Sequence, residues 1–171
     1  MADWAMDSSG LRAAHRSDAL LRLGPGDQIV ISMLTWLPVP AARAAAVSPA
    51  LQFPASVNAP NPTQLTLAGT VEEERNPVVA LCEALEGLHA DGIVCYAHDD
   101  ECDPRRVAEV EAMWRPAGLL SRPTDETISA VLTAERAGRP LVCADVSVRR
   151  LANHCGVSTV TVADFAAALA A

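Results

Sequence analysis

Lysine is absent from the sequence, and all 13 basic residues are arginine. Set against 21 acidic residues, they give a formal net charge of −8. This balance excludes a surface that holds polyanions by bulk electrostatics, but it does not exclude a local arginine patch. Aromatic residues make up only 4% of the chain, so the core must be built from Ala, Val and Leu.

Long hydrophobic runs are also missing. No apolar stretch reaches the roughly 18 residues that a membrane-spanning helix needs, and residues 1–10 lack the apolar centre of a secretory signal. The odd number and irregular spacing of the cysteines argue against a disulfide framework. We therefore expect a cytoplasmic protein with reduced thiols and no membrane partner. The five cysteines are Cys82, Cys95, Cys102, Cys143 and Cys155.

Several common site motifs are missing too. The chain has no P-loop, no G-x-G-x-x-G and no G-x-S-x-G. A zinc site built from Cys95, His98 and Cys102 would lack a C-x-x-C pair, which argues against it.

The chain has 171 residues, half of them hydrophobic, which suits a single domain with a sizeable core. A hard turn at 24–27, Gly-Pro-Gly-Asp, divides an N-terminal arm or helix at 1–26 from a main domain at 27–171. The continuous apolar run Ile29–Leu34 predicts the first buried strand. A second strand is expected at 51–57, within a proline-rich stretch.

The second half carries clear helix and strand signals. Asp103 and Thr124 are expected helix N-caps, and Gly138 and Gly156 are expected helix ends. Asp145 stands at the carboxyl end of a short apolar strand. The expected helices cover 77–91, 104–114, 125–137, 148–155 and 163–171, and the expected strands cover 93–96, 141–144 and 159–162.

Strands therefore alternate with helical segments of 10–15 residues, the usual length of such crossovers. This alternation predicts an α/β fold in which a parallel sheet lies between two helical layers, a three-layer α/β/α sandwich.

The segment from Thr124 to Leu169 resembles a PIN domain, the fold of many metal-dependent ribonucleases, including toxins of bacterial toxin–antitoxin pairs. The residues that carry the resemblance are DETISAVLTAERAGRPLVCADVSVRRLANHCGVSTVTVADFAAAL. They follow the family's order of acid-led helix, glycine turn, strand ending in Asp, helix, glycine, strand and final helix.

The resemblance implies a Mg²⁺ or Mn²⁺ site made of three or four carboxylates at the carboxyl ends of the strands. Asp145 matches the acid after the fourth strand. Asp125 or Glu126 approximates the acid at the preceding helix start, where strict alignment on Ala134 places Thr127. Asp145, Asp125 and Glu126 are the expected catalytic residues. At the other two family positions the chain departs from the pattern. Ser32 and Met33 stand at the end of the expected first strand instead of an Asp, and residues 58–60 lack the expected Glu.

Two acidic runs offer substitute ligands. One is Glu72–Glu74, and the other is the segment 98–101, His-Asp-Asp-Glu, just past the strand at 93–96. Asp99 or Asp100 would lie near Asp145 if that strand is parallel to its neighbours, because parallel strands end at one edge. The expected metal ligands are therefore Asp145, Asp125, Glu126, Asp99 and Asp100.

Three hypotheses about function follow. The first is a PIN-like metal-dependent endoribonuclease in which Arg149 and Arg150 meet the RNA phosphate. The second is a non-catalytic PIN-like module that binds a protein. The third is a helix-turn-helix DNA-binding regulator, based on residues 151–162, which requires a helix at 159–170 where the first two require a strand and then a helix. The partners expected under these hypotheses are RNA, a protein such as an antitoxin, and a second copy of the chain in a homodimer.

Overall fold

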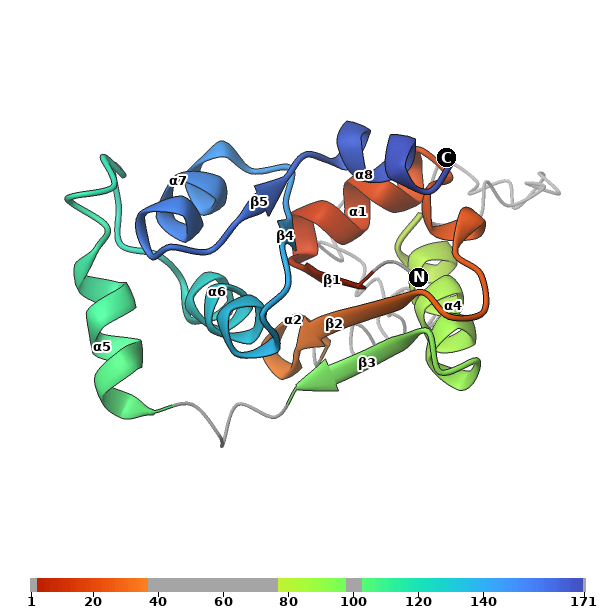
Figure 1. Ribbon diagram of the computed structural model, residues 1–171, viewed down its shortest axis with the longest axis horizontal. Coiled ribbons are helices and arrows are strands. Elements are labelled where there is room, and N and C mark those ends of the chain that lie inside the picture. Colours follow the sequence, from red (N-terminus) through yellow and green to blue (C-terminus); the bar gives the residue numbers. More distant parts are fainter. Residues whose placement is uncertain (1–2, 37–76, 98–102, 171) are drawn as a thin grey trace, which may run out of the picture.

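The computed structural model describes residues 3–36, 77–97 and 103–170. Its five strands form one all-parallel sheet in the order β3-β2-β1-β4-β5 (Figure 1). The strands are β1 (Asp3–Met6), β2 (Gln28–Ser32), β3 (Val94–Ala97), β4 (Leu141–Val142) and β5 (Thr159–Val160). The helices are α1 (Ser8–Arg16), the 3₁₀ turn η1 (Leu20–Arg22), α2 (Met33–Trp36), α4 (Pro77–Ala90), α5 (Pro104–Ala112), α6 (Asp125–Ala137), α7 (Val146–His154) and α8 (Val162–Ala168).

Neighbouring residues of each central strand face opposite cores, as the pleat of a strand requires. Ala5 of β1 belongs to one core, with α6 and α7, while Met6 belongs to the other, with α1, α4 and α8. In β4, Leu141 and Val142 divide in the same way. Helices therefore cover both faces of the sheet, which confirms the expected three-layer α/β/α fold.

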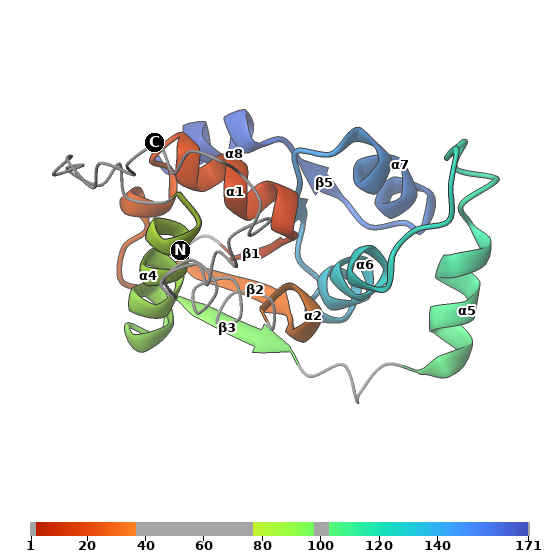
Figure 2. The same ribbon diagram turned by 180° about the vertical axis from the view of Figure 1, so that it is seen from behind.

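Figures 1 and 2 show the arrangement from opposite sides. Helices α1 and α8 run side by side, and α5 lies at the far end of the molecule, beyond α6. Within the three described ranges, no helix is long and apolar enough to cross a bilayer.

Local signals in the second half act as expected. The side chains of Asp103, Thr124 and Asp145 accept hydrogen bonds from backbone N–H groups at the starts of α5, α6 and α7. Gly138 ends α6 in the left-handed region, with φ 62°, where glycine has no side-chain penalty. The helices and strands predicted there are confirmed, although β4 and β5 have two residues each.

The first half differs from the expectation. Residues 3–6 form β1, the central strand of the sheet, so the segment 1–26 contributes to the main domain instead of forming an arm outside it. The run Ile29–Leu34 holds the second strand and not the first, and it ends at Ser32 because α2 begins at Met33. The strand expected at 51–57 lies outside the described residues.

Candidate functional site

The strand order reverses between β1 and β4. β2 and β3 extend the sheet on one side of β1, whereas β4 and β5 extend it on the other. In open α/β sheets, ligands bind outside the carboxyl ends of the strands at such a switch point. Asp7 directly follows β1, and Asp145 follows β4 after two intervening residues. The fold therefore places two carboxylates at the position where a ligand is expected.

Asp7 is almost fully buried, with 4% of its surface exposed. Its Oδ1 accepts a hydrogen bond from the backbone N–H of Gly10 at 2.7 Å, so Asp7 caps α1. The Ser9 hydroxyl donates to the same carboxylate, at 2.8 Å from Oδ2 and 3.0 Å from Oδ1. Burial nevertheless raises the pKa of Asp7 above its ordinary value, and the negative charge of Glu126 raises it further.

Ser9 joins the two acidic loops. Its Oγ accepts hydrogen bonds from the backbone N–H groups of Ala144 and Asp145, each at 3.0 Å. The Ser9 hydroxyl thus donates a hydrogen bond to the Asp7 carboxylate and accepts one from the backbone N–H of Asp145. The switch point is therefore a connected structure in which the loop after β1 fixes the loop after β4.

Gly10 permits this close approach. A Cβ at position 10 would collide with the carbonyl oxygen of Val142 and would lie 3.0 Å from the Met6 side chain. The first turn of α1 can therefore rest against β4 only because residue 10 has no side chain.

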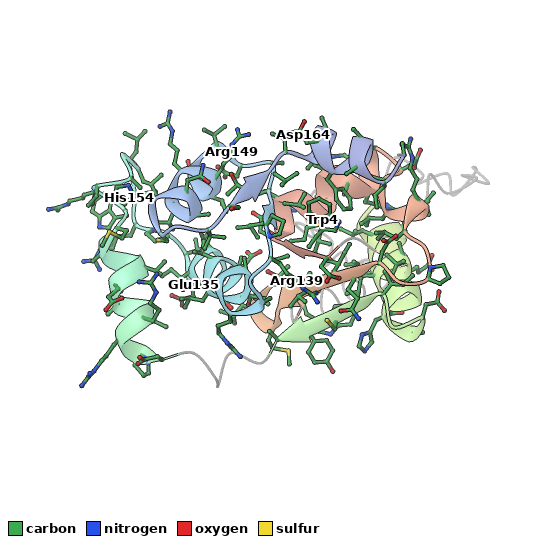
Figure 3. The ribbon with its side chains drawn as sticks, viewed as in Figure 1. Trp4, Glu135, Arg139, Arg149, His154 and Asp164 are labelled. Carbon is green, nitrogen blue, oxygen red and sulfur yellow. The ribbon has the colours of Figure 1, made fainter. Side chains whose placement is uncertain are left out.

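Asp145 is exposed and caps α7 through a 2.6 Å hydrogen bond from the Ser147 N–H to its Oδ1. The thiol of Cys143 is buried in the core that Ala5 shares with α6 and α7. Burial raises its pKa to about 12, with Asp7 and Asp145 contributing to the rise and Arg149 opposing it. The charges of both carboxylates and of Arg149 on α7 therefore act on the Cys143 thiol. Figure 3 labels Arg149.

The first turn of α6 supplies two further acids, which have different surroundings. Glu126 is half-buried and acts electrostatically on Asp7. Asp125 lines a cavity of about 330 Å³ between α2, α5 and α6. Thr124 fixes this turn, because its Oγ1 accepts from the Thr127 N–H at 3.2 Å.

The structure thus brings Asp145 and Glu126, both predicted from the sequence, into the surroundings of Asp7. Asp125 borders the cavity instead, and its role as a ligand stays a prediction. Asp99 and Asp100 lie outside the described residues, as do Glu72–Glu74 and the segment 58–60.

Sequence reasoning missed Asp7. The family pattern asks for an Asp at the end of the first strand, and this Asp was sought at Ser32 because β2 was taken as that strand. In the structure, Ser32 caps α2, since its Oγ accepts from the Thr35 N–H at 3.1 Å. The available signal was the short apolar run Trp4-Ala5-Met6 followed by Asp7 and two serines, a strand followed by a helix cap.

Carboxylate oxygens suit Mg²⁺ and Mn²⁺, which prefer hard ligands. Among the described residues, no Arg forms an ion pair with Asp7, and no three His, Cys, Asp or Glu side chains are grouped closely enough to hold an ion. Mg²⁺ commonly keeps several waters and takes only one or two protein carboxylates, so such an ion does not need a group of three.

Residues 159–160 bear on the helix-turn-helix hypothesis. They form β5, which pairs in parallel with β4, and α8 begins after them at Val162. A strand followed by a helix is the arrangement that the two α/β hypotheses require.

No protein-family model matches the chain, and no curated protein sequence matches it. Among solved structures, the chain is similar to the crystal structure of PAE2754 from Pyrobaculum aerophilum, with a TM-score of 0.53 and 17% sequence identity. The match covers 99% of this chain and 97% of that one. At this identity the likeness shows a shared fold and nothing more.

Proposed function

We propose that the protein is a PIN-like, metal-dependent ribonuclease whose site lies at the switch point, with Asp7, Asp145 and Glu126 as its acids. The observation that carries the proposal is the Ser9 bridge, in which one hydroxyl holds the Asp7 carboxylate and the backbone of Asp145. A bridge of this kind fixes two acidic loops relative to each other, as a metal site requires.

The resemblance to the PIN family supports the proposal more strongly with Asp7 included. Asp7 follows the first strand, which is where the family carries its first acid, and Asp145 follows the fourth. Three family positions are then filled by Asp7, Asp145 and an acid at the start of α6. The position after the second strand remains without an assigned residue.

The electrostatics favour a cation at this site. A buried carboxylate with a second acid beside it is costly, and a divalent ion would offset the repulsion between Asp7 and Glu126. When bound, Mg²⁺ or Mn²⁺ supplies the activation of a water molecule and neutralises charge on the RNA phosphate.

Arg149 is the residue that we expect to meet the phosphate. It is half-buried and acts on the same Cys143 thiol as the two carboxylates. Arg150 is exposed, and we expect it to contribute long-range attraction. A local pair of this kind can bind RNA on an acidic protein, whereas the whole surface cannot.

The test is cleavage of a mixed RNA substrate with and without Mn²⁺. We expect Asp7→Asn and Asp145→Asn to lose about 100-fold or more of the activity, since each loses a ligand charge while Asn preserves the helix cap. Ser9→Ala, which removes the bridge and leaves every acid, is expected to lose about 10-fold.

Asp3→Asn is the matched control, because Asp3 stands at the opposite end of β1 and its ion pair with Arg139 is long, at 3.8 Å. It is expected to cut like the wild type. Metal-dependent cutting that survives both Asp7→Asn and Asp145→Asn would overturn the assignment of the site.

A non-catalytic, protein-binding PIN-like module is the second candidate. It is favoured by the family position after the second strand, which has no assigned acid. A folded wild type that binds no Mn²⁺ and cuts no RNA at high concentration would support this candidate and contradict the first.

The ribonuclease proposal places the protein in the cytoplasm, where RNA is the substrate. An antitoxin partner and a homodimer belong to the toxin form of this proposal. Co-purification of the chain with a small antitoxin-like protein from its own cells would support the toxin form. A monomer that is active alone would argue against it.

A further inference from the structure

The cavity beside α6 is a feature of the described residues that the proposed chemistry leaves unused. Its volume of about 330 Å³ lies within the range of small-ligand sites. Its walls are mainly apolar, and the one charged side chain among its described lining residues is Asp125. The described lining residues are Leu34, Pro104, Val107, Asp125, Ile128, Ser129 and Leu132.

The cavity and the acids share one turn of helix. Asp125 and Glu126 are consecutive residues in the first turn of α6. Asp125 lines the cavity, and the charge of Glu126 acts on Asp7. A ligand group in the cavity would therefore lie beside the helix turn that also carries Glu126, the acid that acts on Asp7. Such proximity suits two parts of one substrate molecule.

The walls of the cavity are held in place. The Arg106 guanidinium of α5 makes two hydrogen bonds to the Glu135 carboxylate of α6, at 3.0 Å and 2.6 Å. Such a two-pronged pair fixes geometry as well as distance. Helix α5 is thereby fixed against α6, and Val107 on α5 keeps its position in the wall.

We propose that this cavity binds one nucleobase of the RNA strand, and that it selects a base with an exocyclic amino group. The inference rests on the proposed ribonuclease function. Leu34, Ile128 and Leu132 offer apolar surface to the planar faces of a base. Carboxylate oxygens accept hydrogen bonds, so the Asp125 side chain pairs with the amino group of cytosine, adenine or guanine.

The same carboxylate rejects the alternatives. Uracil presents the O4 acceptor where cytosine presents its amino group, so O4 faces one carboxylate oxygen and only the N3–H of uracil can donate to the carboxylate. A phosphate would meet the negative charge of Asp125, which directs the phosphate toward Arg149 and the base toward the cavity. An apolar side chain of a partner protein would leave Asp125 without a hydrogen-bond donor.

The test is a titration of the metal-free protein with free nucleosides, in which binding is measured from shifts in the protein's amide NMR spectrum. Because cytidine, adenosine and uridine carry no phosphate, the measurement isolates the cavity from the switch-point acids. We expect cytidine and adenosine to bind at least 10-fold more tightly than uridine, with shifts at residues that line the cavity.

Two variants and a control make the test specific. Val107→Trp fills the cavity from α5 and is expected to abolish binding, whereas Ala108→Trp, at the exposed neighbouring position, is not. Asp125→Asn supplies a donor as well as an acceptor, so uridine should then bind within threefold of cytidine. Thermal unfolding confirms that each variant is folded.

The outcomes separate this inference from the ribonuclease proposal. Equal binding of the three nucleosides, no binding of any, or binding unchanged in Val107→Trp would overturn the inference while RNA cleavage could persist. Selective nucleoside binding in a protein that cuts no RNA would support the cavity assignment and overturn the nuclease.

Discussion

The surroundings of Asp7 disfavour the ionised form of its carboxyl group. Its carboxylate caps α1 and receives the Ser9 hydroxyl, yet burial and Glu126 still raise its pKa. A neutral side chain of the same shape would keep the cap without the cost of the charge. An acid at this position despite its cost is what a ligand-binding role would require.

Asp7→Asn is therefore expected to stabilise the protein in the presence of a chelator. Since the folded state holds the Asp7 proton more tightly than the unfolded state, the ionised group lowers stability as pH rises from the ordinary value of 3.8 through the raised pKa. The advantage of the Asn variant should thus be absent at lower pH and complete above that window. Urea unfolding of both proteins across this range measures it. An Asn variant that is less stable than the wild type at neutral pH would contradict the account.

Gly10 offers a second test at the residue scale. Gly10→Ala is expected to destabilise the protein by about 1–3 kcal/mol, because its methyl group would collide with the Val142 carbonyl oxygen between α1 and β4. Gly87→Ala in α4 is the matched control, since no atom lies within 4 Å of its Cβ position. The control should gain roughly 0.5–1 kcal/mol from helix propensity. Equal responses of the two variants would show that the contact at Gly10 is not tight.

At the scale of elements, helix α6 links the two proposed parts of the site. Its first turn carries Asp125 toward the cavity and Glu126 toward Asp7, and its buried face packs in the core shared with α7. The position of this turn depends on its N-cap, Thr124.

Thr124→Ala is expected to lower the free energy of unfolding by about 1 kcal/mol, because the Thr127 N–H loses its acceptor. Thr124→Ser keeps a hydroxyl and should lose at most a few tenths. Chemical denaturation of the three proteins compares them, and an Ala variant as stable as the Ser variant would show that the cap contributes little.

Helix caps also explain which elements the sequence could predict. Asp103, Thr124 and Asp145 act on N–H groups two or three residues away, so local sequence contains the whole signal. β1 is different. Its four residues are a strand because they pair with β2 on one side and β4 on the other, and those partners lie far along the chain.

The missed strand accounts for the missed acid. With β2 taken as the first strand, the acid at the switch point was sought at Ser32, and Asp7 was left in a supposed arm. Glu126 and Asp145 could be predicted because local helix-start signals mark them. The division of Asp125 and Glu126 between a cavity and an acid could not, because it depends on how α6 packs against α2, α5 and the sheet.

At the scale of the whole molecule, the strand order β3-β2-β1-β4-β5 creates the switch point at which the proposed site lies. Ser9 and Asp145, which form a hydrogen bond, are 136 residues apart in the sequence. They meet because β1 and β4 are neighbours in the sheet. The metal proposal depends on this meeting, since neither loop alone offers a pair of acids.

The most direct test of the account is a Mn²⁺ titration followed by electron paramagnetic resonance, in which bound and free ions give different signals. We expect one Mn²⁺ per chain in the wild type and in Asp3→Asn, and at least about a 10-fold weaker affinity in Asp7→Asn and in Asp145→Asn. Bound metal should also raise the thermal midpoint of the wild type, since it binds the folded state. A wild type that binds no Mn²⁺, or variants at Asp7 and Asp145 that bind it as the wild type does, would contradict the central claim.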